Sequence, residues 1–280
     1  MIWIALFFKL VCPFLLHILQ RSLLFPVNMA SFLITGSSRG LGLAIVKHLL
    51  SFSPTRVGII FATARGSLPA PALVEIIQAS SGRVRFVELD VNDQDSVAAA
   101  TSEIEKSLGS RRGLDVLINN AGVQFPEAAT ASQVRVADLE QTLSTNVTSV
   151  LRVTSAFLPL LIKGKEKKIV NISSTLGSIG WSARSAMAAV PSYKVSKAAL
   201  NMLTVQFAQE LGPKGFTVFA VSPGWLQTDL GGQHAHLTAA DGARATLDII
   251  MNTEPEKDNG SFRDIYVEGS ALYAGQNPPW

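Results

Sequence analysis

The stretch Phe32-Leu-Ile-Thr-Gly-Ser-Ser-Arg-Gly-Leu-Gly42 decides the fold. Its first four residues form an apolar run typical of a buried strand, and the segment 41–50 carries apolar residues at helical spacing. Glycines at positions 36, 40 and 42 fill the turn between them. Glycine lets a backbone approach a phosphate closely, and the amides at a helix N-terminus attract that phosphate. The stretch therefore predicts a strand, a phosphate-binding turn and a helix, with a glycine-rich surface turn as the alternative.

Alternating strands and helices continue along the rest of the chain. The predicted strands are apolar without alternation, which is typical of a parallel sheet covered on both faces in an α/β protein. They cover Phe32–Thr35, Val57–Ala64, Val84–Leu89, Asp115–Asn119, Lys168–Ser173, Thr217–Ser222 and a weaker Ile265–Val267. Helices are predicted over 70–79, 96–108, 139–161 and 192–211. Because no repeat or low-complexity linker interrupts this pattern, we expect one domain over residues 29–280.

The composition argues against several classes of protein. The chain has 280 residues and a net charge of +3, with no basic block beyond 163–168, which does not favour nucleic-acid binding. Its only cysteine is Cys12, which excludes disulfides and thiolate metal sites elsewhere. His234 and His236 form a His-x-His pair, but no third ligand is apparent beyond Asp229 and Asp241. We therefore expect no metal site.

Residues 1–28 form an apolar extension. The run from 2 to 24 is interrupted by Lys9, Pro13, His17 and Arg21, so no uninterrupted segment reaches the ~18 residues of a spanning helix. It is a candidate membrane anchor or signal-like segment, or an artefact of the start site, because residue 29 begins a complete-looking domain. We expect a cytoplasmic protein, with membrane association through 1–28 as the alternative.

The pentapeptide Tyr193-Lys-Val-Ser-Lys197 predicts proton chemistry. On a helix, residues four apart share one face. A phenol titrates near ~10, and a nearby ammonium favours the phenolate and lowers that pKa. The spacing therefore predicts a tyrosine that exchanges a proton near neutral pH, although an exposed helix face would show the same two residues.

The segment after the glycines indicates which dinucleotide would bind. An NAD enzyme needs a carboxylate about 20 residues past them to bind the ribose 2′-hydroxyl. No Asp or Glu occurs between Gly42 and Glu75. Arg39 lies in the turn and Arg65 follows the second strand, and guanidinium groups suit a 2′-phosphate. We predict NADP(H), although either arginine alone could be a surface charge.

Further motifs in the same order make the chain resemble the short-chain dehydrogenase/reductase family. They are the Gly-x-x-x-Gly-x-Gly turn, Asp90-Val91, Asn119-Asn-Ala-Gly122, Asn146 in a Thr-Asn-Val context, Ser173-Ser174, Tyr193-x-x-x-Lys197 and Ser222-Pro-Gly-Trp225. The runs 196–202 and 223–232 and the ending Gly275-Gln-Asn-Pro-Pro-Trp280 look like those of sniffer and C-factor-type carbonyl reductases. The resemblance implies a doubly wound Rossmann domain with a seven-stranded parallel sheet.

The resemblance also implies roles for individual residues. Tyr193 would protonate the substrate oxygen, and Lys197 would lower the tyrosine pKa and hold the nicotinamide ribose. Ser174, rather than Ser173, would hold the carbonyl oxygen, and Asn146 would hold a water that links Lys197 to solvent. The cofactor-binding residues would be Gly36, Ser38, Arg39, Gly40, Leu41, Gly42, Arg65, Asp90, Val91, Asn120, Ala121, Gly122, Tyr193, Lys197, Pro223, Gly224, Leu226 and Thr228.

The expected function is NADPH-dependent reduction of a ketone or aldehyde on a small apolar molecule, such as a biosynthetic ketoreductase step. An NADP-dependent alcohol dehydrogenase and a catalytically silent NADP(H)-binding protein are the alternatives. Ser174 and Tyr193 are 19 positions apart, wider than in many family members, and the extra segment 180–189 is expected at the substrate mouth. The resemblance further implies a homodimer or homotetramer.

Overall fold

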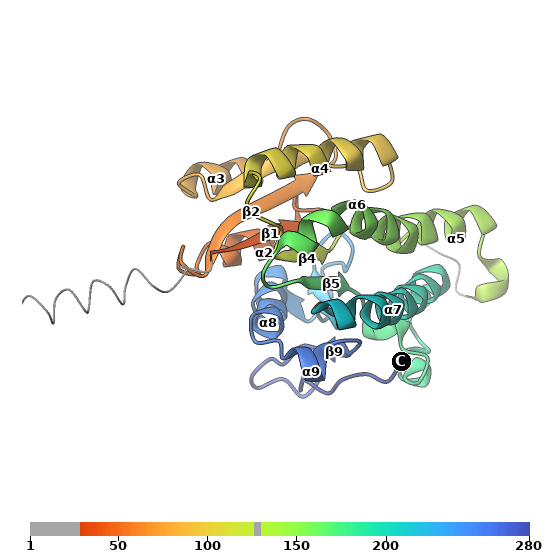
Figure 1. Ribbon diagram of the computed structural model, residues 1–280. Helices are drawn as coiled ribbons and strands as arrows, with labels where there is room; N and C mark the ends of the chain where they lie inside the picture. The colour runs from red at the N-terminus through yellow and green to blue at the C-terminus, as the bar shows by residue number, and fades with distance from the viewer. Residues whose placement is uncertain (1–28, 126–129) are drawn as a thin grey trace, which may run out of the picture.

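A seven-stranded parallel sheet forms the centre of the protein (Figure 1). The computed structural model describes residues 29–125 and 130–280, so the predictions for 1–28 lie outside the described residues. The sheet order is β3-β2-β1-β4-β5-β6-β9, and a separate pair is formed by β7 and β8. The strands are β1 Ala30–Ile34, β2 Val57–Ala64, β3 Val84–Glu88, β4 Val116–Asn119, β5 Lys168–Ile172, β6 Thr217–Ser222, β7 Leu226–Gln227, β8 Leu237–Thr238 and β9 Phe262–Asp264.

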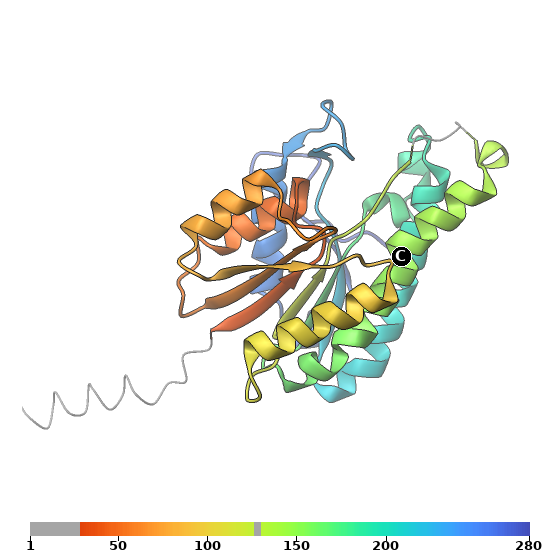
Figure 2. The same cartoon turned by 90° about the horizontal axis from the view of Figure 1, so that it is seen from above.

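Helices cover both faces of the sheet, as Figure 2 shows. One layer contains α2 Gly40–Leu49, α3 Pro71–Ala79 and α8 Ala239–Met251, and the other contains α4 Gln94–Leu108, α6 Ser149–Lys163 and α7 Pro191–Leu211. α5 Val136–Leu143 continues through a π-helical turn, Ser144–Thr148, into α6, and the short α9 Pro255–Asp258 precedes β9. The predicted doubly wound Rossmann fold with a seven-stranded sheet is confirmed.

Strand β1, in the interior of the sheet, shows why both faces must be covered. Successive side chains of a strand point to opposite faces. Phe32 and Ile34 of β1 pack into a core with Leu247 of α8, whereas Leu33 between them packs into a second core with Phe157 of α6. All five side chains are buried. An apolar run without alternation is therefore what a strand with two dry faces requires.

The last strand differs from its prediction. The sequence indicates Ile265–Val267, but the strand that pairs with β6 is Phe262–Asp264. Ile265 is fully buried in the core beyond the paired residues, so its apolar character reflects packing rather than sheet pairing. Helix α8, which covers β1 from one side, was not predicted either.

The stretch Val136–Lys163 is the one helical segment of the described residues that is long and apolar enough to cross a membrane, by length and composition only. Half of its most apolar window is buried within the fold. Val153, Phe157 and Leu160 of α6 belong to the core beneath the sheet. Core packing therefore accounts for the buried half of this window.

The strand order reverses direction between β1 and β4. β2 and β3 lie on one side of β1, and β4, β5 and β6 lie on the other. Chain connections diverge at such a point and leave a crevice at the carboxyl ends of the strands, where ligands of open α/β sheets bind. The turns after β1 and β4 flank this crevice, and both carry predicted site residues.

Candidate active site

A cavity of about 1310 Å³ opens along the carboxyl ends of the strands. Its walls come from the turns after the sheet strands and from the start of α7. Every residue named above for the catalytic and cofactor sites lines this cavity, with the exception of Asn146. The fold therefore brings together residues that are up to about 190 positions apart in the chain.

The glycine turn is held in place from behind. Gly36 and Gly40 have positive φ angles of 71° and 56°, which favour glycine, and a Cβ on Gly42 would lie 2.2 Å from the carbonyl oxygen of Gly36. The side-chain amide of Asn120 donates to the carbonyl oxygens of Thr35, at 2.8 Å, and Gly36, at 3.1 Å. Asn120 thus fixes the turn, because its side-chain amide donates to backbone carbonyls of that turn.

This turn fits the phosphates of a dinucleotide. No side chain caps the N-terminus of α2, and Gly40, Leu41 and Gly42 at that end line the cavity. The unsatisfied amides and the positive end of the helix dipole attract an anion there. A Cβ at position 42 would fill the space that the close approach of the backbone requires.

The far end of the cavity carries Arg65, directly after β2, and Asp90 and Val91, after β3. The Asp90 carboxylate accepts a 2.9 Å hydrogen bond from the backbone of Asn92 and so shapes its own turn. Arg39 forms a 2.7 Å ion pair with Asp229 on the opposite wall, and both side chains are largely exposed. The cavity thus has arginines in the turns after β1 and β2, and no carboxylate follows β2. This arrangement suits a 2′-phosphate.

Tyr193 and Lys197 enter the cavity from the same face of α7. Both are buried, with 8% and 5% of their surface exposed. The Lys197 ammonium donates a 2.7 Å hydrogen bond to the carbonyl oxygen of Ile172. Tyr193 and Ser174 are hydrogen-bonded to each other through their side chains. Ser173 instead donates to the side-chain carbonyl of Asn201 at 2.6 Å, so Ser174 is the serine that meets the tyrosine.

The pKa of Tyr193 departs from the sequence-based expectation. Burial raises the pKa of Tyr193 to about 12, and the hydrogen bond from Ser174 offsets only part of this effect. Burial also lowers the pKa of Lys197 to about 8. The predicted lowering of the tyrosine pKa is therefore wrong for this structure, because desolvation of the buried phenol raises it. The phenol is protonated at neutral pH, as a proton donor requires.

Asn146 lies behind the cavity rather than in it. It sits in the π-helical turn before α6. Its side-chain oxygen accepts from the backbone of Val123 at 2.8 Å, and its amide donates to the Val123 carbonyl and to the Ser196 hydroxyl, each at 2.9 Å. Asn146 ties the turn after β4 to α7, and its role toward a water near Lys197 stays a prediction.

The substrate end of the cavity has two walls. One is the extra segment between Ser174 and Tyr193, where the Arg184 guanidinium lies 4.2 Å from the centre of the Trp181 ring. The other is the segment after β6, where the Trp225 ring packs edge-on against His236 at 4.9 Å. The expected position of residues 180–189 at a cavity mouth agrees with this arrangement.

Asp264 and Tyr273 line the same cavity and were missed by the sequence reasoning. Tyr273 accepts a 3.1 Å hydrogen bond from the backbone of Trp225. Asp264 hydrogen-bonds Ser222, and burial raises its pKa to about 6. The signal was available, because a polar residue at the carboxyl end of the last parallel strand must lie at this edge. The sequence-based prediction placed that strand three residues too late, so Asp264 was not recognised as its last residue.

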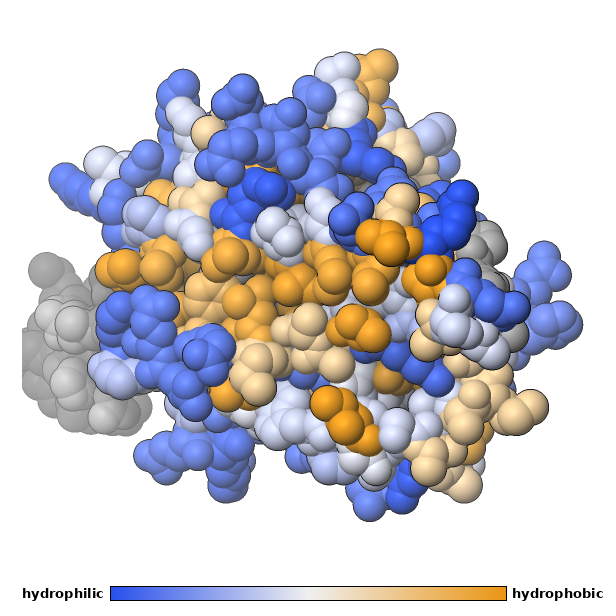
Figure 3. All heavy atoms as spheres, turned by 90° about the vertical axis from the view of Figure 1, so that its right-hand side faces the viewer, coloured by the Kyte–Doolittle hydropathy of each residue, from blue (hydrophilic) through white to orange (hydrophobic). Residues whose placement is uncertain are grey.

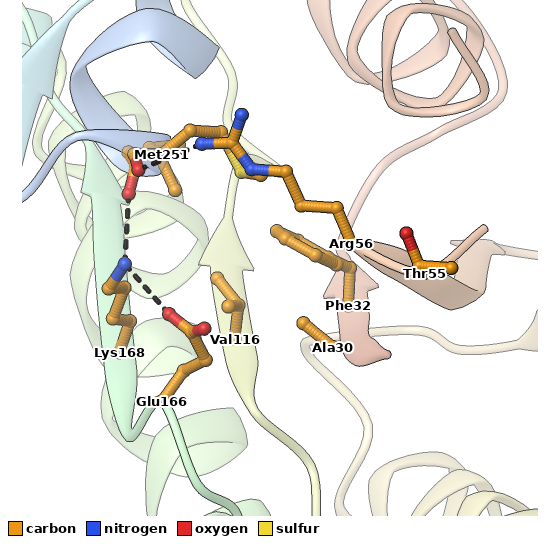
Figure 4. A pocket seen from close by; sticks show the side chains of 9 residues that line it. Ala30, Phe32, Thr55, Arg56, Val116, Glu166, Lys168 and Met251 are labelled. Atoms are coloured by element: carbon orange, nitrogen blue, oxygen red, sulfur yellow. Dashed lines mark hydrogen bonds and ion pairs between the residues drawn. The ribbon is translucent and has the colours of Figure 1, made fainter. Parts of the chain in front are cut away.

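A second cavity, of about 280 Å³, lies at the opposite, amino edge of the sheet (Figure 4). Lys168 there forms a 2.9 Å ion pair with Glu166 and donates to the carbonyl of Ile250. Arg56 donates to the carbonyl of Met251. Its charged groups thus already have partners. Within residues 29–125 and 130–280, no group of three or more His, Cys, Asp or Glu side chains is placed to hold a metal ion.

The fold and the cavity together define a nicotinamide-dependent oxidoreductase. The family profile described as short chain dehydrogenase matches residues 30–237, and the chain belongs to this family. The C-signal protein of Myxococcus xanthus is 39% identical over 167 residues, which cover 60% of this chain and 93% of that protein.

Solved structures agree with this assignment. The carbonyl reductase Sniffer of D. melanogaster is 32% identical, with a TM-score of 0.79, and 90% of this chain and 100% of that chain are covered. An NADPH-bound carbonyl reductase from chicken fatty liver is 31% identical, with a TM-score of 0.79, and 90% and 95% are covered. The predicted resemblance is confirmed, and the protein is an NADP(H)-dependent short-chain oxidoreductase.

Proposed function

We propose that this protein reduces the carbonyl group of a ketone or aldehyde on a small, apolar molecule at the expense of NADPH. The observation that carries the proposal is the hydrogen-bonded pair of Tyr193 and Ser174 hydroxyls in the cavity wall, with the phenol held protonated by burial. When bound, the reduced nicotinamide supplies the hydride. The protein then has to bind and orient the carbonyl and deliver one proton.

Each polar residue of the wall has a role in this proposal. Tyr193 donates its proton to the substrate oxygen, and Ser174 hydrogen-bonds that oxygen and fixes its direction of approach. The positive charge of Lys197 stabilises the phenolate that remains after proton transfer. Lys197 also holds the ribose of the cofactor. Asn146 supports the site from behind by joining the β4 turn to α7. These roles follow the family pattern at matching positions.

The cofactor would lie along the whole edge of the sheet. The backbone of residues 36–42 takes the pyrophosphate, and Asp90 and Val91 border the adenine. Arg65 and Arg39 bind the 2′-phosphate, for which Arg39 exchanges its exposed partner Asp229. The nicotinamide end is bordered by the turn after β6, through Pro223, Gly224, Leu226 and Thr228.

The substrate end favours an apolar compound. Trp181, Met187, Trp225 and Leu272 line the mouth, and Met187 and Leu272 are 97% and 65% exposed. Large exposed apolar side chains around a cavity mouth are typical of a site that buries an apolar ligand. Reduction is proposed over oxidation because cells keep NADP(H) mainly in its reduced form.

Two copies of the chain would associate through α6 and α7. The side of the molecule that carries these helices shows a broad apolar area (Figure 3). Leu151 and Ile162 of α6 and Val195 and Met202 of α7 are 46% to 61% exposed. Such an exposed apolar face indicates a protein interface. We propose that the protein forms a homodimer or homotetramer. We also propose that it lies in the cytoplasm, with membrane association through residues 1–28 as the alternative location.

A panel of ketones and aldehydes tests the function directly. Wild-type protein is assayed with NADPH and with NADH in parallel, and Tyr193→Phe serves as the blank. The proposal expects turnover with NADPH for apolar carbonyl compounds, weaker turnover with NADH, and none above background for the variant. Retained NADPH binding without turnover on any carbonyl would contradict it.

A further inference from the structure

Residues 273–280 touch both walls of the substrate end. We name this segment the terminal strap. It begins beside the segment after β6 and ends beside the segment between β5 and α7 (Figure 1). The mechanism proposed above makes no use of it. Its contacts explain how two walls that belong to different parts of the chain are kept at a fixed separation.

The end of the strap is bonded to the wall that carries Ser174. The Ser178 hydroxyl donates to the carbonyl oxygen of Pro279 and accepts from the backbone of Trp181 at 3.1 Å. The backbone of Gly180 donates to the carbonyl oxygen of Trp280 at 3.2 Å. Ser178 is 2% exposed, so its hydroxyl is shielded from water, whereas Gly180 and Trp280 are exposed.

The contact between strap and wall is also tight. A Cβ on Gly180 would lie 2.7 Å from the ring of Pro279, so a larger residue at 180 would force the two apart. The strap is in turn fixed to the sheet. The ring of Trp280 stacks on Phe262 of β9, with 5.4 Å between centres and 19° between planes, and Arg263 donates to Asn277 at 3.2 Å.

The beginning of the strap holds the other wall. Tyr273 is 8% exposed, and its hydroxyl accepts from the backbone of Trp225 at 3.1 Å and lies 3.3 Å from the His236 ring nitrogen. Trp225 and Trp181 both line the cavity, one on each side. One short segment thus bridges the two aromatic walls.

The wall held by Pro279 and Trp280 continues into the catalytic serine. The backbone of Ser178 donates to the carbonyl of Thr175 at 3.1 Å, and that of Gly177 donates to the carbonyl of Ser174 at 2.8 Å. A shift of the wall at Ser178 is therefore passed along one tight turn to Ser174. The cofactor-binding turns after β1, β2 and β3 make no such contact with the strap among the described hydrogen bonds.

We propose that the terminal strap is a positioning element that sets the width of the substrate mouth and the place of Ser174, with Trp280 as its key residue and Ser178 as the key residue of the wall that it holds. This inference rests on the proposed function for its kinetic consequence only. Loosening the strap at Trp280 frees the wall 178–190, so the carbonyl compound binds more weakly. Tyr273 at the other end still holds the turn after β6, so NADPH binding stays unchanged.

The test compares wild type with Trp280→Ala, Ser178→Ala and the conservative Trp280→Phe. Leu68→Ala, which removes an 82% exposed apolar side chain outside the cavity, is the matched control. Amide hydrogen exchange of residues 178–190, the KM for a carbonyl substrate and the Kd for NADPH are measured on the full chain. For the two alanine variants we expect roughly tenfold faster exchange and a roughly three- to tenfold higher KM, with an unchanged Kd for NADPH. Trp280→Phe should keep the wild-type exchange rate and the wild-type KM, because its ring can still stack on Phe262.

Unchanged amide exchange at residues 178–190 in both alanine variants would overturn the proposed role of the strap. Faster exchange with an unchanged KM would overturn it as well. A variant that loses NADPH binding to the same extent would show a general structural defect and overturn it as well. The exchange measurement needs no turnover. If wild type reduced no carbonyl compound, the proposed function would fail while the exchange result still decided whether the strap holds the wall.

Discussion

The ammonium of Lys197 lies 5.5 Å from the centre of the Tyr193 ring, and both side chains are buried on one face of α7. The ammonium is close enough to act on a charge at the phenol oxygen, and the hydrogen bond described for it goes to the carbonyl of Ile172 rather than to Tyr193. The lysine therefore acts on the tyrosine through its charge. That charge depends on pH, because burial lowers the pKa of Lys197 to about 8.

Carbonyl reduction should lose activity as the pH rises through about 8. The pKa of Tyr193 is raised to about 12, so the phenol keeps its proton over this range, whereas Lys197 is charged below a pKa of about 8 and neutral above it. The loss of the positive charge makes the phenolate product of proton transfer less stable. The measurement is kcat/KM at saturating NADPH against pH. Lys197→Arg should move the fall to higher pH, and an activity that rises through pH 8 would contradict the assignment.

Arg65→Ala should weaken NADPH binding roughly tenfold or more, while NADH binding changes little. Hydrogen bonds to charged groups contribute about 1.5–3 kcal/mol, and only NADPH carries the 2′-phosphate. The Kd values of both cofactors are measured by fluorescence titration. Arg244→Ala removes a surface arginine outside the cavity and is the control. Equal losses for the two cofactors would show that Arg65 does not bind the 2′-phosphate.

Asp229→Asn should strengthen NADPH binding by a small factor, at most about fivefold. Its ion pair with Arg39 joins two walls of the cavity, and exposed pairs of this kind contribute roughly 0–1 kcal/mol. Without the carboxylate, Arg39 is available to the 2′-phosphate at no cost. The effect should vanish in the background of Arg39→Ala. Weaker NADPH binding by Asp229→Asn would instead indicate that the ion pair itself builds the cofactor site.

The buried carboxyl of Asp264 should make the fold less stable as the pH rises. Burial raises the pKa of Asp264 to about 6, so the folded state binds this proton more tightly than the unfolded state. The associated stability is fully present below the ordinary pKa near ~4 and is lost as the pH rises through about 6. A difference on the order of 2 kcal/mol in the free energy of unfolding is expected between these limits.

Urea unfolding of wild type and Asp264→Asn at several pH values checks this. The variant should show a flatter dependence between the two limits, because it cannot ionise. Asp241, whose pKa is lowered by its hydrogen bond with Thr238, is the control position, and Asp241→Asn should keep the wild-type fall. A wild type that gains stability from pH 4 to 7 while Asp264→Asn behaves identically would contradict the prediction.

Met202→Glu should convert the assembled protein to single chains. Met202 is 61% exposed on α7, and a charge there would be buried without a partner in the proposed interface. Light scattering after gel filtration should give the mass of one 29.9 kDa chain for the variant and a multiple of it for wild type. Leu68→Glu, on another surface, should leave the mass unchanged. A wild type with the mass of one chain would rule out the interface.

Most of the cavity could be predicted from the sequence, for a physical reason. Parallel strands end at one edge of a sheet, so residues that directly follow apolar runs must gather there. This places the glycine turn, Arg65, Asp90, the Asn120 turn and Ser174 on one wall without any knowledge of side-chain packing. Helical spacing similarly places Tyr193 and Lys197 on one face.

What failed depended on packing at long range. The pKa of Tyr193 is decided by burial, which no local spacing reports. Spacing also did not report the hydrogen bonds that Asn120 and Asn146 make to Gly36 and Val123, which fix two turns of the site, while the predicted roles of both residues stay predictions. Asp264 was missed because the apolar Ile265 beside it was interpreted as the start of the last strand. Ile265 is apolar because it packs in the core, not because it pairs in the sheet.

The most direct test of the account is single-turnover oxidation of NADPH by wild type and Tyr193→Phe, with one accepted carbonyl substrate. A proton donor that acts in the transition state contributes roughly 10²- to 10⁴-fold. We therefore predict a loss of that size in the rate for the variant, with the Kd for NADPH unchanged because the ring still fills its place. A variant that oxidises NADPH at the wild-type rate would contradict the claim that Tyr193 is the acid of the reaction.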